Sequence, residues 1–191
     1  LKFVFNGQLH PWVGGKNLIL HIIGDIGIDG ALYAAMEFGG DAISSLTMDG
    51  RFTMSNMAIE AGGKAGLFPV DAVTEEFIAA HPPKYDTTGL RAYDTDSDAD
   101  YARVIEYDAT KIEPLVAFPH LPSNIRPVSQ AGHISVDQVV IGSCTNGRIS
   151  DLRTACELLR GRPVHPNVRC IVIPGTQAVY RQAMDEGLIE A

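Results

Sequence analysis

The sequence has no long apolar run, no closely paired cysteines and no excess of basic residues. No apolar stretch approaches the roughly 20 residues that a membrane-spanning helix needs, and the first residues do not read as a signal peptide. There are 15 Lys and Arg against 23 Asp and Glu, a net charge of -8, whereas nucleic-acid binding requires clustered basic residues. We therefore expect neither a membrane nor a nucleic-acid partner.

The three cysteines, Cys144, Cys156 and Cys170, form an odd set without a CxxC pair. This disfavours a disulfide scaffold and indicates a reducing compartment, so we expect a cytoplasmic protein. The chain begins with Leu1 and stops after DEGLIEA, which we interpret as a piece of a longer protein.

The first part of the chain mixes strand and helix patterns. LKFVFNGQLHPWV alternates around an Asn-Gly dipeptide, which predicts a two-stranded hairpin. Helices are expected over GGKNLILHIIGDIG, from about Met54 to Ala61, and over AVTEEFIAAHPP, where Thr74 is the candidate N-cap. ALYAAMEFGG is compatible with either a strand or a short helix.

Composition then changes along the chain. Residues 84–100 are polar, and the following stretch to residue 130 is expected to contain one or two strands; its four prolines disfavour long regular structure beyond Phe118. From residue 131, the order strand, helix, strand, helix predicts parallel βαβ units. The expected fold class is α/β, with a lobe over 1–83, a linker and Pro-rich traversing segment over 84–130, and the start of a βαβ domain over 131–191.

Cys144 follows the apolar run VVIGS and precedes a predicted helix. Ligands bind at such loops in open α/β sheets, because the helix N-terminus offers unpaired N–H groups and a partial positive charge. The same field favours the thiolate, which attacks electrophiles or ligates iron. The alternative is a small residue in a tight turn. Cys156 and Cys170 fall in apolar patterns and are expected in the core.

Asn56 and Glu60 form a second candidate group. Four residues apart on a helix, an amide and a carboxylate share one face, although an exposed polar stripe is the alternative. Arg51 and Arg148 are each candidates to bind a carboxylate, or solvated surface residues. The six histidines show no HxH or HxxxH spacing, which disfavours a zinc site made from this chain alone.

Two motifs in this order, TMSNMAIEAGGKAGLF and VVIGSCTNGRISDLR, resemble the aconitase superfamily, most closely its branch of 3-isopropylmalate dehydratase and prokaryotic homoaconitase large subunits. The resemblance covers nearly the whole chain apart from residues 84–100. It implies the three-layer αβα-type sheets of that family, present here in part. It also implies that Cys144 is one of three cysteine ligands of a four-iron four-sulfur cluster, and that Asn56 and Glu60 are catalytic. Arg148 is the candidate for substrate binding.

The activity that the resemblance implies is an iron–sulfur hydro-lyase, which isomerises a 2-substituted malate by dehydration and rehydration. 3-Isopropylmalate dehydration in leucine biosynthesis is the first expectation, with homoaconitase and 2,3-dimethylmalate dehydratase large subunits as alternatives. The substrate would be a hydroxy di- or tricarboxylic acid, and the partner a small subunit with a swivelling domain.

The family's CxxC pair, its HGDSHT-type segment and the small subunit's serine base are absent from this sequence. We therefore expect the isolated chain to be inactive. Two alternatives from other classes stay open. Cys144 is a covalent nucleophile with His133 or His165 as its base, or the chain is a Rossmann-like binding module.

Overall fold

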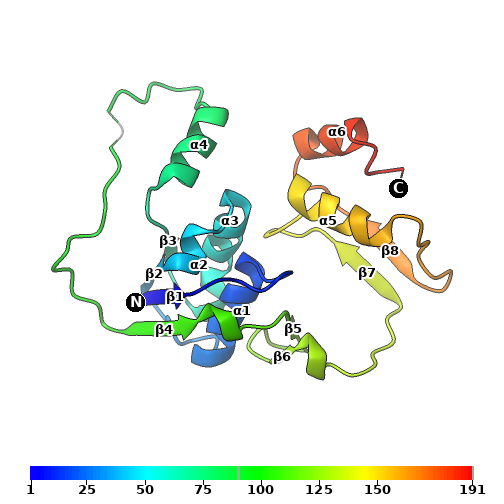
Figure 1. The fold of residues 1–191 in the computed structure, drawn as a ribbon, viewed down its shortest axis with the longest axis horizontal. Coiled ribbons are helices and arrows are strands. Elements are labelled where there is room, and N and C mark those ends of the chain that lie inside the picture. Colours follow the sequence, from blue (N-terminus) through cyan, green and yellow to red (C-terminus); the bar gives the residue numbers. More distant parts are fainter. Residues whose placement is uncertain (90, 191) are drawn as a thin grey trace. The chain divides into compact units, whose positions relative to one another are not determined.

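The computed structural model describes residues 1–89 and 91–190, and the chain forms two compact units, Leu1–Ala131 and Gly132–Ala191. Figure 1 shows the elements in chain order, coloured from blue to red. The elements of the first unit are β1 (Lys2–Asn6), α1 (Gly15–Ile26), β2 (Ala35–Gly39), α2 (Asp41–Ser44), α3 (Met48–Met57), η1 (Ala58–Ala61), β3 (Ala65–Leu67), α4 (Ala72–Ala80), β4 (Val104–Asp108), η2 (Ala109–Lys111), β5 (Leu115–Ala117), β6 (Ile125–Pro127) and η3 (Val128–Gln130).

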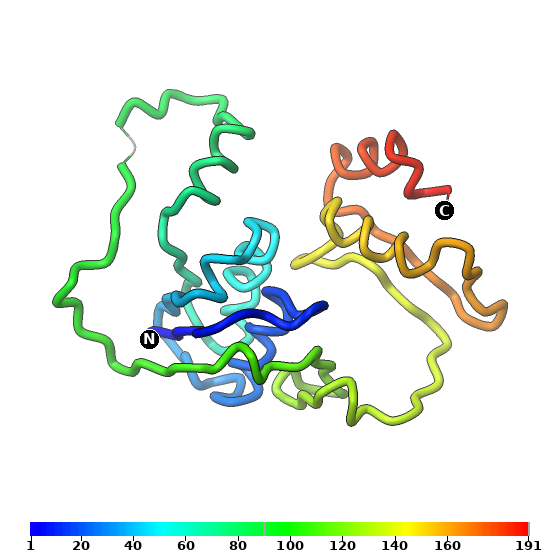
Figure 2. Tube along the Cα trace, in the orientation of Figure 1, coloured from blue at the N-terminus to red at the C-terminus, as the bar shows by residue number. Residues whose placement is uncertain are grey.

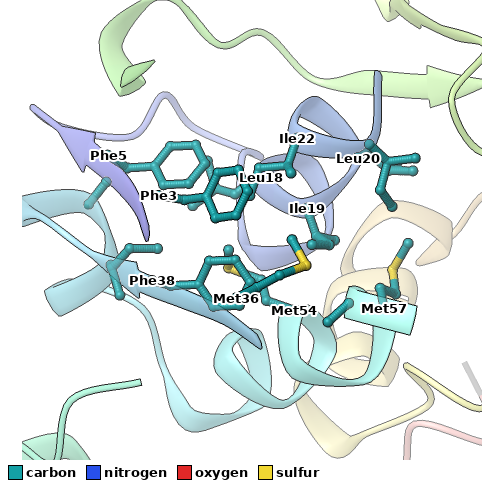
Figure 3. Packing of buried hydrophobic residues seen from close by; sticks show 14 of the residues in the cluster. Phe3, Phe5, Leu18, Ile19, Leu20, Ile22, Met36, Phe38, Met54 and Met57 are labelled. Atoms are coloured by element: carbon teal, nitrogen blue, oxygen red, sulfur yellow. The ribbon is translucent and has the colours of Figure 1, made fainter. Parts of the chain in front are cut away.

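The first unit is built on a parallel four-stranded sheet in the order β3-β2-β1-β4. The strands alternate, so that Phe3 and Phe5 of β1 are fully buried while Lys2 and Val4 face the other side. Figure 3 shows the buried rings beside the apolar side chains of α1 and α3. The parallel sheet with its helices confirms the predicted α/β class.

The predicted N-terminal hairpin is wrong. β1 pairs with β2 on one edge and with β4 on the other, both in parallel, and residues 8–14 contain no strand. The dipeptide Asn6-Gly7 does end the strand, as its turn preference indicates. Both edges of β1 are nonetheless occupied by strands from far along the chain, so no edge remains for a neighbouring hairpin strand.

The opposite face of the sheet meets the segment that follows α4. Figure 2 shows the chain running from α4 to β4, and the described residues of this stretch, 81–89 and 91–103, form no helix or strand. Its Thr95 and Tyr101 hydroxyls donate to Glu37 Oε2 over 3.0 and 2.8 Å, and Lys2 Nζ lies 3.2 Å from Glu37 Oε1. Residues 101–130 hold three strands, one more than predicted, because β4 joins the main sheet in addition to the small antiparallel pair β5–β6.

Helices α1 and α3 pack closely where Gly15 meets Gly50. A Cβ atom on Gly15 would lie 2.2 Å from the Gly50 carbonyl oxygen, whereas a Cβ on Gly14 would meet nothing within 4 Å. We expect Gly15→Val to lower the free energy of unfolding by about 2 kcal/mol or more, because the helices must separate to admit the side chain. Gly14→Ser is the matched control and should change stability by less than about 0.5 kcal/mol. Thermal unfolding followed by circular dichroism measures both, and equal melting temperatures would contradict the close packing.

The described residues of the second unit, 132–190, form a parallel βαβ arrangement followed by a helix. They comprise β7 (Gln138–Ile141), α5 (Ile149–Leu159), β8 (Arg169–Val172) and α6 (Gln177–Asp185), and β7 pairs with β8 in parallel. This confirms the predicted order of elements. Cys156 on α5 is buried as expected, but Cys170 on β8 is only half-buried, because it lines an open apolar cavity of about 530 Å³ between α5 and the two strands. In the part of the chain that the structure describes, no helix is both long and apolar enough to cross a membrane.

Candidate functional site

The loop from Gly142 to Arg148 joins β7 to α5 and carries Cys144. Gly142 and Gly147 adopt φ angles of +109° and +95°, which side chains other than glycine rarely accept. Both also approach the backbone of the next βα loop, where a Cβ on either residue would lie within 2.6 Å of the Ile173 carbonyl oxygen. The two glycines of GSCTNG therefore serve the backbone of a tight loop at the carboxyl end of the sheet.

Cys144 is exposed at this loop, between two hydroxyl residues that bond each other. The Ser143 and Thr145 hydroxyl oxygens lie 3.0 Å apart, and Thr145 is itself buried. The Cys144 thiol is free and accessible, whereas Cys156 is buried in the same unit. The structure thus places the predicted cysteine where a ligand can reach it.

The donor set for an iron–sulfur cluster can be tested on these residues. Cys144 fits one ligand position, because it is an exposed thiol in the loop that joins the parallel strand β7 to α5. Among the residues described, no three His, Cys, Asp or Glu side chains come together as a metal site. A cluster at Cys144 would therefore need further ligands that these residues do not bring together.

Asn56 and Glu60 lie at the end of α3, but not on one continuous α-helix. The predicted helix begins earlier, at Met48 with Thr47 as its N-cap, and after Met57 it tightens into the 3₁₀ turn η1. Because a 3₁₀ turn has 3.0 residues per turn, Glu60 lies further round the axis from Asn56 than the α-helical spacing predicts. The Gly62 N–H donates to the Ile59 carbonyl oxygen and the Gly63 N–H to the Ala58 carbonyl oxygen, which closes this turn.

Both side chains are accessible in the first unit. Asn56 is exposed and Glu60 half-buried, and neither makes a hydrogen bond or ion pair to another described residue. Next to Asn56, the Ser55 hydroxyl donates to the Gly66 carbonyl oxygen over 2.9 Å, which fastens the last turn of α3 to β3. The end of α3 therefore presents an amide and a carboxylate from a fixed backbone.

Arg148 forms the junction between the loop and α5. It is the N-cap residue of α5, and its backbone N–H donates to Asp151 Oδ2 over 2.9 Å. The side chain is half-buried. Arg148 belongs to the same loop as Cys144, four residues further on.

Arg51 is not available to bind a substrate carboxylate, contrary to one of the two interpretations given above. It is 1% exposed, and its Nη1 and Nη2 each donate to Asp71 over 2.7 Å, with a further bond from Nη1 to the Thr74 hydroxyl. Asp71, not Thr74, is the N-cap of α4, because its carboxylate accepts from the Thr74 N–H. Arg51 therefore ties α3 to the start of α4.

Removing this guanidinium should destabilise the first unit. Arg51→Met leaves the Asp71 carboxylate without its buried partner. We expect the free energy of unfolding to fall by about 2–3 kcal/mol, which is at the lower end of, or below, the cost of breaking a fully buried ion pair. Lys111→Met is the control in the same unit, because it removes the exposed pair of Lys111 with Asp108. It should leave the unfolding midpoint in urea nearly unchanged.

The pH dependence of that loss follows from Asp71. The hydrogen bond from Arg51 lowers the pKa of Asp71 from 3.8 to about 2. A carboxyl group whose pKa is lower in the folded state stabilises the fold above its ordinary pKa, and this contribution disappears as the pH falls through the folded value. The difference in stability between the protein and Arg51→Met should therefore be constant near neutral pH and shrink from pH 3.8 towards 2. A difference that does not change across this window would contradict the pairing.

Asp151 is a functional candidate that the sequence reading missed. Its carboxylate accepts from the Gly147 and Arg148 N–H groups and from Asn146 Nδ2. An acidic residue three positions after the helix N-cap was the available signal, since this is the spacing of a capping box.

In open α/β sheets ligands bind at the carboxyl ends of the strands, and the β7–α5 loop with its accessible Cys144 lies at such an end. A model of the Aconitase family (aconitate hydratase) matches residues 1–133 and 129–191, so this chain belongs to the aconitase family. The family inferred from the two motifs is thereby confirmed.

Several relatives match over the whole chain. The chain is 60% identical over 190 residues to the 3-isopropylmalate dehydratase large subunit of Heliobacterium modesticaldum, and 57% identical over 190 residues to that of Clostridium kluyveri. It is 59% identical over 189 residues to the protein of the same name from Moorella thermoacetica. These matches cover 99–100% of this chain but 44% of each relative, so the chain spans less than half of their length.

Proposed function

We propose that this chain is part of a 3-isopropylmalate dehydratase large subunit, a hydro-lyase of leucine biosynthesis. The observation that carries the proposal is an identity of 57–60% along essentially the whole chain to large subunits of that name. The reaction moves a hydroxyl group between adjacent carbons of a 2-substituted malate by dehydration and rehydration. Homocitrate-type and dimethylmalate-type substrates share the malate core and are the alternatives.

We further propose that Cys144 provides one thiolate of a four-iron four-sulfur cluster. When bound, such a cluster would supply Lewis acidity to the substrate's hydroxyl and carboxylate oxygens. The free, exposed thiol of Cys144 and the glycine-built loop that carries it support this assignment. Two more thiolates would complete the set, which agrees with a chain that spans only part of its relatives.

The side chains of this chain would then bind the substrate and move its protons. Glu60 has the carboxylate that a proton transfer at the substrate hydroxyl requires, and it makes no hydrogen bond to a described residue that would occupy it. Asn56 offers an amide to orient the hydroxyl, and Arg148 a guanidinium to bind a substrate carboxylate.

The partner that we propose is a small subunit, because the relatives are named large subunits. It would contribute the remaining catalytic group and the contacts to the variable part of the substrate. The free thiols of the described chain fit a reducing compartment, and we propose the cytoplasm.

A cysteine-nucleophile enzyme is less well supported than the hydro-lyase. Such an enzyme needs a base within hydrogen-bond reach of the sulfur. Within residues 1–89 and 91–190, no hydrogen bond joins Cys144 to a histidine, and the His165 ring instead accepts from the Asn167 N–H over 3.2 Å. The match along the whole chain to large subunits likewise favours the hydro-lyase over a Rossmann-like binding module.

The test is reconstitution of the full-length protein. It is treated with iron and sulfide without oxygen, mixed with its small subunit, and assayed separately with 3-isopropylmalate, homoaconitate and 2,3-dimethylmalate. We expect visible absorbance from a cluster and the fastest turnover with 3-isopropylmalate. A faster reaction with another malate would move the substrate assignment, and the absence of both cluster and turnover would overturn the proposal.

A further inference from the structure

We propose that Asp151 is a positioning residue, which fixes the Gly142–Arg148 loop and thereby the direction of the Cys144 thiol. The inference rests on the proposed role of Cys144 as a cluster ligand. It assigns to Asp151 no contact with the cluster or the substrate.

Both carboxylate oxygens of Asp151 are used within the loop. Oδ2 accepts the backbone N–H groups of Gly147 and Arg148, each over 2.9 Å, and Oδ1 accepts Asn146 Nδ2 over 3.1 Å. Two adjacent N–H groups that point at one oxygen fix the backbone between them, and bonds to an ionised acceptor are stronger than neutral ones. One side chain on α5 therefore holds three consecutive residues of the loop.

A chain of hydrogen bonds extends this hold to both neighbours of Cys144. The Asn146 side chain, held by Asp151, accepts from the Thr145 hydroxyl over 3.0 Å. Thr145 in turn lies 3.0 Å from the Ser143 hydroxyl, and the Ser143 N–H donates to the Asn146 carbonyl oxygen over 3.2 Å. Cys144 lies between two fixed residues, so the direction of its Cα–Cβ bond is set by the same bonds.

The other side of the loop is held by backbone alone. The Gly175 N–H donates to the Gly147 carbonyl oxygen over 2.6 Å, and Gly142 packs against Ile173. With the backbone of the β8–α6 loop on one side and Asp151 on the other, Gly147 is held from both directions. Only the Asp151 side of this arrangement can be removed by changing a side chain.

Asp151→Asn tests the proposal, because it keeps the shape but replaces one acceptor oxygen by an amide donor. The matched control is Glu157→Gln, which removes the same charge from an exposed position on the same helix. Both changes are made in the full-length protein. The first measurement is hydrogen exchange of the peptide containing residues 143–150 in the cluster-free protein. The second is the rate at which an iron chelator removes the reconstituted cluster.

In Asp151→Asn we expect faster hydrogen exchange of that peptide and cluster loss about 10-fold faster. Mutating residues that hydrogen-bond to metal ligands typically lowers metal affinity by about 10-fold or more. Glu157→Gln should behave as the unchanged protein. Asn146→Ala, which removes one arm of the network, should shift both rates in the same direction by a smaller factor, and it serves if Asp151→Asn does not fold.

The outcomes separate the two proposals. If the unchanged protein forms a cluster and Asp151→Asn matches Glu157→Gln in both rates, the positioning role is overturned. If the unchanged protein forms no cluster, the proposed function fails. In that case, the exchange measurement alone decides whether Asp151 fixes the loop.

Discussion

Replacing Cys144 by serine in the full-length protein is expected to abolish the proposed iron–sulfur cluster and to reduce the proposed dehydratase activity by more than about 100-fold. Changes to residues that only contact a metal ligand already lower metal affinity or activity about 10- to 100-fold. A serine hydroxyl is not deprotonated near neutral pH and is a poor ligand for iron in such clusters. The cluster absorbance after anaerobic reconstitution and the turnover with the small subunit measure the two effects.

Cys170→Ser is the control for this experiment. Cys170 is also a free thiol of the second unit, but it lies half-buried in β8 and lines an apolar cavity. Its replacement should keep the absorbance and most of the activity. If Cys144→Ser retains the cluster, or if both variants lose it equally, Cys144 is not a ligand. A thiol that reacts rapidly with an alkylating agent regardless of iron would favour the nucleophile alternative instead.

Sequence patterns correctly predicted those elements whose formation depends on residues close together in the chain. The helix over Gly15–Ile26 has apolar residues at helical spacing, and it formed where expected because one continuous face is buried against the sheet. The hairpin failed for the opposite reason. Its turn signal was local, but the strand partners of β1 are 35 and 102 residues away along the chain, and nothing in the strand itself identifies them. The helix start at Met48 was missed because the Thr47 cap precedes a segment with weak apolar periodicity.

The same distinction applies to the candidate site. The position of Cys144 between a strand and a helix was predictable, because the signals for both elements are local. A β-branched apolar run, a glycine and the start of a helical pattern all fall within about a dozen residues. The role of Arg51 was not, since its partner Asp71 lies 20 residues further on, across a strand. A buried guanidinium in an ion pair and a solvated one look alike in sequence. The position of Asp151 three residues after the helix N-cap indicated a capping role in the sequence. The three groups that donate hydrogen bonds to its carboxylate are identified only by the folded loop.

Glu60→Gln should separate catalysis from cluster binding. The amide has the shape of the carboxylate but cannot accept or release a proton at neutral pH, so we expect kcat to fall about 100-fold or more, within the range for loss of a general acid or base. Cluster absorbance should be unchanged, because Glu60 lies in the first unit and supplies no thiolate. KM should change little if Asn56 and Arg148 provide the binding contacts.

Glu76→Gln is the matched control, an exposed acid on α4 of the same unit that loses the same charge. Because Glu60 has no hydrogen bond or ion pair to a described residue, its replacement should not alter the melting temperature either. A loss of activity with unchanged melting and unchanged cluster absorbance therefore reports chemistry at the carboxylate. Full activity of Glu60→Gln would exclude a proton-transfer role, and loss of the cluster would mean that the end of α3 supports the cofactor instead.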